Sequence, residues 1–486
     1  MALPLAILLC LASGYFIAVL GWPQRPSQRD FPVLACLACG CGFGLFSFVY
    51  VLSRASGNYH LIATDFAVCG FLFFAFLLIR SRRSAQLSEP IENWQTNFAA
   101  SRILTAVFLF ALGAALYASI TRVIVHPHGE GWDAFSIWNL HARFLFRSGS
   151  AWTDGFNPLI PWSHPDYPLL TPGAIAHFWT YLGHETQAVP AVIAIVFTFS
   201  TVGLLYSSLV LLRGRITAML AALALLTTPF FIEQGTSQYA DVPLSFFILA
   251  TVSLLCLHDS IAQNDDSGTN RLLILAGLNA GFAAWTKNEG LLFLAALIAA
   301  RALTLIREAS RNTSEPKHPA IKPFVLLLLG MAPALLVIAW FKHFIAPPGD
   351  LFPDRALALH KLFEPARYEA VLRWYGKEFL RFGDWLLIPA TILLVVFFFL
   401  IRRNDRQQST FAPGFFTSAV ALSLTLAGYF VIYLITPRDF YWHLRNSLNR
   451  LFLQLWPSAI FLFFLLVTPT VKKPAHMHPG PTQSLQ

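Results

Sequence analysis

The feature that most constrains this chain is a series of apolar stretches, each roughly twenty residues long. At 1.5 Å per residue, a helix of about 20 residues crosses the ~30 Å hydrocarbon core of a bilayer. Backbone groups inside lipid must be paired within their own segment, so each stretch is expected to be a helix. Only 12% of the residues are charged, against ~25% in soluble proteins. These features predict an all-α polytopic membrane protein.

We predict about thirteen membrane-spanning helices. Their expected ranges are 2–21, 31–53, 60–80, 102–124, 188–211, 216–232, 242–258, 271–286, 290–306, 323–344, 384–401, 413–435 and 451–470. The first lacks the basic residues that precede a cleaved signal peptide, so we interpret it as an uncleaved span. Residues 1–470 are expected to form one transmembrane domain, followed by a flexible cytoplasmic tail, 471–486.

The loops between these spans divide into a basic set and a more elaborate set. The basic loops carry Arg25 and Arg29, Arg80 to Arg83, Arg213 and Arg215, Arg307 to Lys322, Arg402 to Arg406, and Lys472 and Lys473. Cytoplasmic loops are enriched in Lys and Arg, so this set is assigned to the cytoplasm. The other side then carries 125–187, 233–241, 287–290, 345–383 and 436–450, with the active site facing outward from the cell (inner) membrane.

Two of these outer segments should contain helices that do not cross the membrane. The apolar segment Leu169–Gly183 is too short to span, and treating it as a juxtamembrane or interfacial helix keeps the charge alternation consistent. The large outer loop 345–383 mixes charges with aromatic residues, which predicts amphipathic helices on the outer surface.

The first large outer loop, 125–187, holds the candidate catalytic carboxylates. Asp133 follows a glycine-rich turn and precedes a helical pattern, so it is either a helix cap or a base that deprotonates an acceptor hydroxyl. Further along, two prolines hold His164 and Asp166 in a rigid turn. His164 is a candidate for contact with an anionic group, and Asp166 is a candidate for a second acid/base or for a metal-binding carboxylate. The alternative for this turn is a proline-rich helix entry with a capping Asp.

Charged residues also lie where later spans begin or end. Asp241, which precedes Pro243 at a span entrance, is a candidate substrate-binding residue, and helix capping is the alternative role. Lys287 and Glu289 join two apolar spans. Burying a charge at such a position costs free energy unless the charge is paired, reaches the aqueous interface along its side chain, or serves a function. Lys287 is a candidate phosphate clamp, and Glu289 is a candidate substrate-binding residue.

The outer segment 436–450 combines arginines, histidine and asparagines immediately before a span. On a helix, Asp439, His443 and Arg450 share one face, and Arg438 and Arg445 lie on an adjoining face. Arginine forks suit phosphate oxygens, so Arg438, His443, Arg445 and Arg450 are candidate substrate-binding residues.

Other motifs are interpreted structurally. Cys36, Cys39 and Cys41 lie inside an apolar span, where helix packing is favoured over a metal site. Gly277 and Gly281 form a GxxxG pattern that predicts close helix packing. No nucleotide-binding fingerprint is present, and no basic face suggests nucleic acid as a partner.

Taken in order, the motifs resemble those of GT-C type membrane glycosyltransferases, of the group related to protein mannosyltransferases (family 39) and lipid A aminoarabinose transferases. The matching pieces are Gly131–Asp133, His164–Leu169, Tyr239–Leu244, Thr286–Gly290, Thr436–Asp439, Trp442–His443 and Leu453–Pro457. The resemblance implies a GT-C-like helix bundle and a sugar donor carried on polyprenyl phosphate. It implies a glycan, lipid or protein acceptor in cell-envelope glycan biosynthesis.

The same resemblance implies roles for individual residues. Asp133 corresponds to the catalytic base, and His164 and Lys287 to groups that bind the lipid phosphate. Family members often carry an adjacent acidic pair, whereas here Glu130 lies three residues before Asp133. This departure leaves the metal unassigned: a divalent cation is a possible cofactor, and no other cofactor is expected.

Two other functions are compatible with the same polar residues. A flippase or transporter for a lipid-linked sugar would also bind phosphate, but it would need polar groups near the membrane midplane. An O-antigen ligase or polymerase would use a pyrophosphate-linked donor. Clustering of the polar residues on one side favours one-sided transferase chemistry.

Overall fold

In the computed structural model the described residues are 2–23, 25–58, 60–80, 98–262, 268–311, 321–349, 355–385 and 412–466. All elements of secondary structure in these ranges are helices. In chain order they are α1 (Ala2–Leu20), α2 (Phe31–Ala55), α3 (Leu61–Arg80), α4 (Phe98–Val125), η1 (Ala134–Trp138), α5 (Asn139–Arg147), η2 (Gly149–Phe156), η3 (Pro161–Ser163), α6 (Leu170–Leu182), α7 (Ala188–Arg213), α8 (Arg215–Leu226), α9 (Pro229–Thr236), α10 (Asp241–Ala262), α11 (Asn270–Thr286), α12 (Asn288–Arg311), α13 (Ile321–Phe344), α14 (Arg355–Leu362), α15 (Pro365–Arg381), α17 (Pro413–Ile435) and α18 (Phe440–Leu466). The predicted span 384–401, apart from its first two residues, and the predicted tail 471–486 lie outside these ranges.

Within the described ranges, ten helices are long and apolar enough to cross a membrane, and they confirm a multi-pass membrane protein. They coincide with ten of the predicted spans. The predicted span 216–232 corresponds to the pair α8 and α9, which is bent by 68° at a short break. The predicted span 271–286 corresponds to α11, which at 17 residues is shorter than the ten. It is buried along most of its length, so its neighbours rather than lipid cover it.

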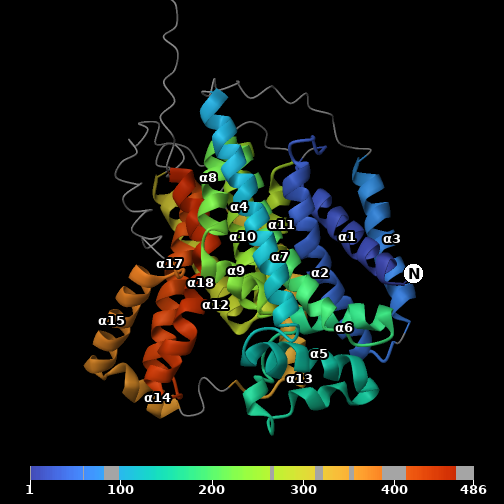
Figure 1. Ribbon diagram of the computed structural model, residues 1–486, viewed down its shortest axis with the longest axis vertical. Coiled ribbons are helices and arrows are strands. Elements are labelled where there is room, and N and C mark those ends of the chain that lie inside the picture. Colours follow the sequence, from blue (N-terminus) through green and yellow to red (C-terminus); the bar gives the residue numbers. More distant parts are fainter. Residues whose placement is uncertain are drawn as a thin grey trace, which may run out of the picture.

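The spans run side by side, and α10 lies at the centre of the bundle (Figure 1). In α10, 78% of the apolar window is buried, because α7, α11, α17 and α18 pack around it. By contrast, only 6% of the α3 window and 11% of the α4 window are buried. Exposed side chains such as Phe71 and Phe110 on these helices therefore face lipid.

Close packing of α11 against α13 confirms the role predicted for the GxxxG pattern. A Cβ added at Gly277 would overlap the Leu327 carbonyl oxygen, and one added at Gly281 would lie 2.6 Å from the Cβ of Ala334. Small residues allow two helix backbones to approach where side chains would hold them apart. This contact brings the ends of α11 and α13 together next to the polar residues described below.

One end of the bundle carries most of the non-spanning helices, at the bottom of Figure 1, and is called the loop end. It contains 126–187, α14 and the polar turns that precede α10 and α18. As predicted, α6 does not span: it lies across the bundle (Figure 1). Its burial differs from that of a surface helix, because α2, α5 and α7 cover it and Leu170–Phe178 is buried throughout. The predicted helices of the loop 345–383 are α14 and α15.

Candidate functional site

Five of the residues singled out in the sequence meet in one chain of ion pairs, called here the charged network: Asp133, Asp241, Lys287, Glu289 and Arg450. Arg450 on α18 places Nη2 2.7 Å from Asp133 Oδ2 and 2.9 Å from Asp241 Oδ2. Lys287 places Nζ 2.9 Å from both Asp241 Oδ1 and Glu289 Oε1. Residues from four separate parts of the chain are thus joined at the loop end.

Asp241 is the centre of this network. Its side chain is fully buried, and it accepts hydrogen bonds from Lys287 Nζ, from Arg450 Nε at 3.0 Å and from Gln454 Nε2 at 2.6 Å. Tyr429 in turn donates its hydroxyl to Gln454 Oε1 at 2.7 Å. A buried carboxylate is tolerated only when it is paired and hydrogen-bonded in this way. Asp241 therefore holds α10, α18 and the α11–α12 turn in register.

Asp133 owes its position to a tight turn and a local helical irregularity. The preceding Gly129 and Gly131 have φ values of +82° and +86°, a conformation that favours glycine. After Asp133 the chain forms the π-helix η1, a feature often found at functional sites. The Asp133 carboxylate makes no capping hydrogen bond, so helix capping does not account for it.

Among the acidic residues predicted for the site, Asp133 is the most accessible. Its side chain is 23% exposed, compared with 0% for Asp241, 8% for Asp166 and 15% for Glu289. A carboxylate that takes a proton from a bound acceptor must be reachable by that acceptor. Asp133 meets this requirement better than the other three.

Tyr239 lies directly beside Asp133 and Arg450. The Arg450 guanidinium lies 4.6 Å from the centre of the Tyr239 ring, which is a cation–π contact. Burial, together with the negative charge of Asp133, raises the pKa of Tyr239 to about 12. Tyr239 therefore stays protonated at neutral pH and adds no further negative charge to the network.

Asp166 belongs to a second cluster, with Asn288 and Lys342. Asn288 Nδ2 donates to Asp166 Oδ2 at 2.7 Å, and Lys342 Nζ lies 3.4 Å from the same oxygen. Lys342 also donates to Asn288 Oδ1 at 2.9 Å and to the Asp166 carbonyl oxygen. The sequence reasoning missed Asn288 and Lys342. A lysine at the polar end of an otherwise apolar span was the signal for Lys342.

The proline-rich turn brings His164 to Arg438. His164 adopts φ +50°, its ring stacks on Tyr167 with centroids 4.6 Å apart, and Arg438 Nη2 donates to His164 Nε2 at 3.2 Å. Tyr167 contacts Trp138 of η1, which links this turn to the helix that follows Asp133. Two predicted phosphate-binding residues, 274 positions apart in sequence, are thereby placed together.

The two remaining candidates on α18 face different surroundings. His443 Nδ1 lies 2.8 Å from Thr436 Oγ1, and its ring lies 4.9 Å from that of Tyr433, so it braces the turn before α18. Arg445 is exposed and lines a cleft toward α15, away from the charged network.

The described residues contain no group of three or more His, Cys, Asp or Glu that could hold a metal ion. Asp133, Asp241 and Glu289 are close to one another, but Arg450 and Lys287 lie between them and neutralise them. A divalent cation does not fit this arrangement, because bound cations need carboxylates free to coordinate. In α2, Cys41 packs against Asn279 of α11, 3.9 Å from Nδ2, in agreement with a packing role.

In comparisons with known proteins, residues 163–340 match the sequence model of the dolichyl-phosphate-mannose-protein mannosyltransferase family. No curated protein and no solved structure matches the chain. The matched region includes Asp166, Asp241, Lys287 and Glu289 but not Asp133 or Arg450. The match bears out the resemblance to GT-C type enzymes and supports a membrane glycosyltransferase.

Proposed function

We propose that this chain, a multi-pass membrane protein of the GT-C glycosyltransferase type, moves a sugar from a polyprenyl phosphate to an acceptor hydroxyl. The acceptor is a glycan, lipid or protein at the outer face of the cell membrane. The observation that carries the proposal is the placement of Asp133: a reachable carboxylate whose Oδ2 is held 2.7 Å from Arg450 by a buried network. The family match over residues 163–340 supports the donor class.

In the proposed reaction the acceptor hydroxyl attacks the anomeric carbon of the donor sugar while Asp133 takes its proton. A new C–O bond forms to the acceptor oxygen, and the C–O bond to the lipid phosphate breaks. The bonding electrons leave with the phosphate, so the products are the glycosylated acceptor, the polyprenyl phosphate and protonated Asp133. A single displacement of this kind inverts the anomeric configuration.

Arg438 and His164 are the residues that we assign to the donor phosphate. Their side chains meet at the loop end, and a guanidinium can pair with two phosphate oxygens at once. Positive charge at the phosphate stabilises the charge that develops as the phosphate leaves.

Lys287 and Asp166 receive supporting roles in this proposal. The Lys287 ammonium already contacts two carboxylates and is 4% exposed, so it serves to fix Asp241 and Glu289 rather than to clamp phosphate. Asp166 is engaged by Lys342 and Asn288, and it ties the first outer loop to α12 and α13. Both residues then act by holding Asp133 and the His164 turn in place.

Outward orientation of the loop end is part of the same proposal. Among the described residues, Arg25, Arg29, Arg213 and Arg215 lie in the connections of the opposite end. By the positive-inside rule those connections are cytoplasmic.

The test is sugar transfer in proteoliposomes that contain the purified protein and labelled polyprenyl-phosphate sugars. We expect Asp133→Asn to abolish transfer while the protein remains folded. The matched control is Asp154→Asn, an exposed residue of the same loop that forms no ion pair within the described residues, and it should transfer like wild type.

Full transfer by Asp133→Asn would remove Asp133 as the base. Transfer by the wild-type protein only from pyrophosphate-linked donors would replace the proposal with a ligase or polymerase. Movement of the labelled lipid between leaflets without any transfer would replace it with a flippase.

A further inference from the structure

The corner between α9 and α10, residues 237–240, lies against the segment that carries the proposed base. That segment, residues 127–139, is called the base turn here. All four residues of the corner contact the base turn, and three of the four are buried. At the end of the corner, Ala240 packs against Ile137 and Trp138 of the base turn. The mechanism proposed above gives these contacts no role.

Gln238 ties the two ends of the base turn together with one side chain. Its Nε2 donates to the Pro127 carbonyl oxygen at 3.0 Å, and its Oε1 accepts from Asn139 Nδ2 at 2.9 Å. Pro127 and Asn139 are the first and last residues of the base turn, and Asp133 lies midway between them. Because both hydrogen bonds end on one planar amide, that amide sets the separation of the two ends.

The backbone of Gln238 indicates that this side chain is required. Gln238 has a φ of +61°, a conformation that favours glycine and is uncommon for residues with a side chain. Backbone in this region costs free energy and persists only where the surrounding structure imposes it. Glycine at this position would avoid the strain and would still let the corner pack against the base turn, but it would supply no amide. The strain is therefore explained by the two hydrogen bonds.

The corner also shapes the middle of the base turn. A Cβ added at Gly129 would lie 2.7 Å from the Ser237 carbonyl oxygen. One added at Gly131 would overlap the Tyr239 hydroxyl oxygen. The Tyr239 ring lies 4.6 Å from the guanidinium of Arg450, the ion-pair partner of the proposed base. Tyr239 thus contacts the base turn through its hydroxyl and the partner of the base through its ring.

We propose that Gln238 and Tyr239 are positioning residues for sugar transfer: Gln238 fixes the base turn, and Tyr239 fixes Arg450 beside it. Asp241, the residue that follows the corner, holds Arg450 as well. Both positioning residues act through Asp133 rather than on the substrate. This inference rests on the proposed transferase function, because the exact place of Asp133 matters only if it takes a proton. A misplacement of about 1 Å can slow a reaction ~100-fold, so a loosened base turn should slow the chemical step.

The first experiment measures the transfer kinetics of Gln238→Gly. Glycine adopts positive φ readily, so this change removes the amide and leaves the backbone unstrained. We expect kcat to fall ~10- to 100-fold while the KM for donor and the KM for acceptor change less than about twofold. The matched control is Gln234→Ala, one turn earlier on α9, whose side-chain oxygen has no hydrogen-bond partner in the described part of the chain. It should keep the wild-type kcat.

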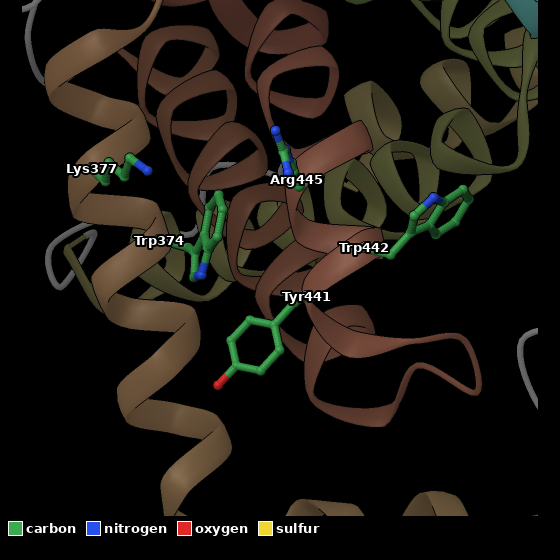
Figure 2. Close-up of a pocket in the computed structure, with 5 residues that line it drawn as sticks. All are labelled: Trp374, Lys377, Tyr441, Trp442 and Arg445. Carbon is green, nitrogen blue, oxygen red and sulfur yellow. The ribbon is translucent and has the colours of Figure 1, made fainter.

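The second experiment compares two changes at Tyr239. Tyr239→Phe keeps the ring on Arg450, whereas Tyr239→Leu removes both the ring and the hydroxyl. We expect the Phe variant to keep about a third or more of the wild-type kcat and the Leu variant to lose ~90% or more, with little change in either KM. The control is Trp374→Leu in the cleft between α15 and α18 (Figure 2), where the Trp374 ring lies 4.8 Å from Lys377 Nζ. This control removes a similar cation–π contact away from the base turn and should transfer like wild type.

Two kinetic results would count against the proposal. A wild-type kcat in Gln238→Gly or in Tyr239→Leu overturns the role of that residue. A raised KM for donor or acceptor with unchanged kcat overturns positioning, because the corner would then belong to a binding site.

Hydrogen exchange in nanodiscs separates this inference from the proposed function. The backbone amides of the base turn should exchange on the order of tenfold faster in Gln238→Gly than in wild type or in Gln234→Ala, because a released turn opens more often. Faster exchange throughout the bundle would mean general unfolding and overturns the positioning role. If the base turn alone exchanges faster but wild type never transfers sugar, the transferase proposal fails and the hold of Gln238 on the base turn stands. If wild type transfers sugar and Gln238→Gly changes neither exchange nor kcat, the transferase proposal stands and this inference fails.

Discussion

Replacement of Asp241 by asparagine tests whether Asp241 stabilises the charged network while Asp133 carries out the proposed chemistry. Asp241→Asn preserves shape but removes the charge shared by Arg450 and Lys287, and it turns one polar atom from acceptor to donor. Asp241 is fully buried, and removing one partner of a buried ion pair costs ~3–5 kcal/mol. We expect the free energy of unfolding to fall by about that amount.

The same change at Asp133 should cost far less. Asp133 is 23% exposed and has one ion-pair partner, so solvent compensates for much of the lost interaction. Partly exposed pairs contribute ~1 kcal/mol or less. Asp133→Asn should therefore lose transfer and keep its stability, whereas Asp241→Asn should lose stability first.

The assay is equilibrium unfolding in mixed micelles of a mild detergent and SDS, followed by circular dichroism. A double-mutant cycle of Asp241→Asn with Lys287→Met then isolates the pair, and we expect a coupling energy of ~1–3 kcal/mol. Additive effects of the two changes, or an Asp241→Asn protein as stable as wild type, would refute the view that Asp241 anchors the site.

Two further predictions concern pH and orientation. Burial, with a smaller effect from His164, lowers the pKa of His141 to about 3 from 6.5. Below pH 6.5 the unfolded chain binds a proton that the folded chain excludes, so stability should fall by ~1.4 kcal/mol per pH unit as pH decreases toward 3. His141→Gln should flatten this dependence in the same unfolding assay, and an unchanged slope would contradict it. For orientation, a cysteine at exposed Ser150 should react with a membrane-impermeant maleimide in intact cells, whereas one at exposed Gln28, at the other end, should react only after lysis. The reverse pattern would place the loop end in the cytoplasm.

The sequence analysis singled out several side chains because charged residues are unusual at their positions. Lys287 and Glu289 interrupt two apolar segments, and Arg450 enters a third. Charges at such places are costly, so they stand out whatever their partners are. The three residues proved to lie in one network with Asp133 and Asp241.

The partners themselves were not evident from the sequence. Capping was an open alternative for Asp133 and Asp241, yet both carboxylates pair with Arg450, which lies 317 and 209 positions further along the chain. Lys287, considered as a phosphate clamp, lies between two carboxylates. Lys342 escaped notice because its neighbours Asp166 and Asn288 come from other segments.

The sequence alone determines the properties that each segment has independently of its neighbours. Apolar length predicts a span, charge at a span end predicts a polar site, and small residues spaced by four predict a packing face. What required the tertiary structure is which segments become neighbours. The contact of α10 with α18, the approach of α11 to α13 and the cleft between α15 and α18 all join distant parts of the chain. Ion pairing and burial depend on those neighbours, because the free energy of a buried charge is set by the groups around it.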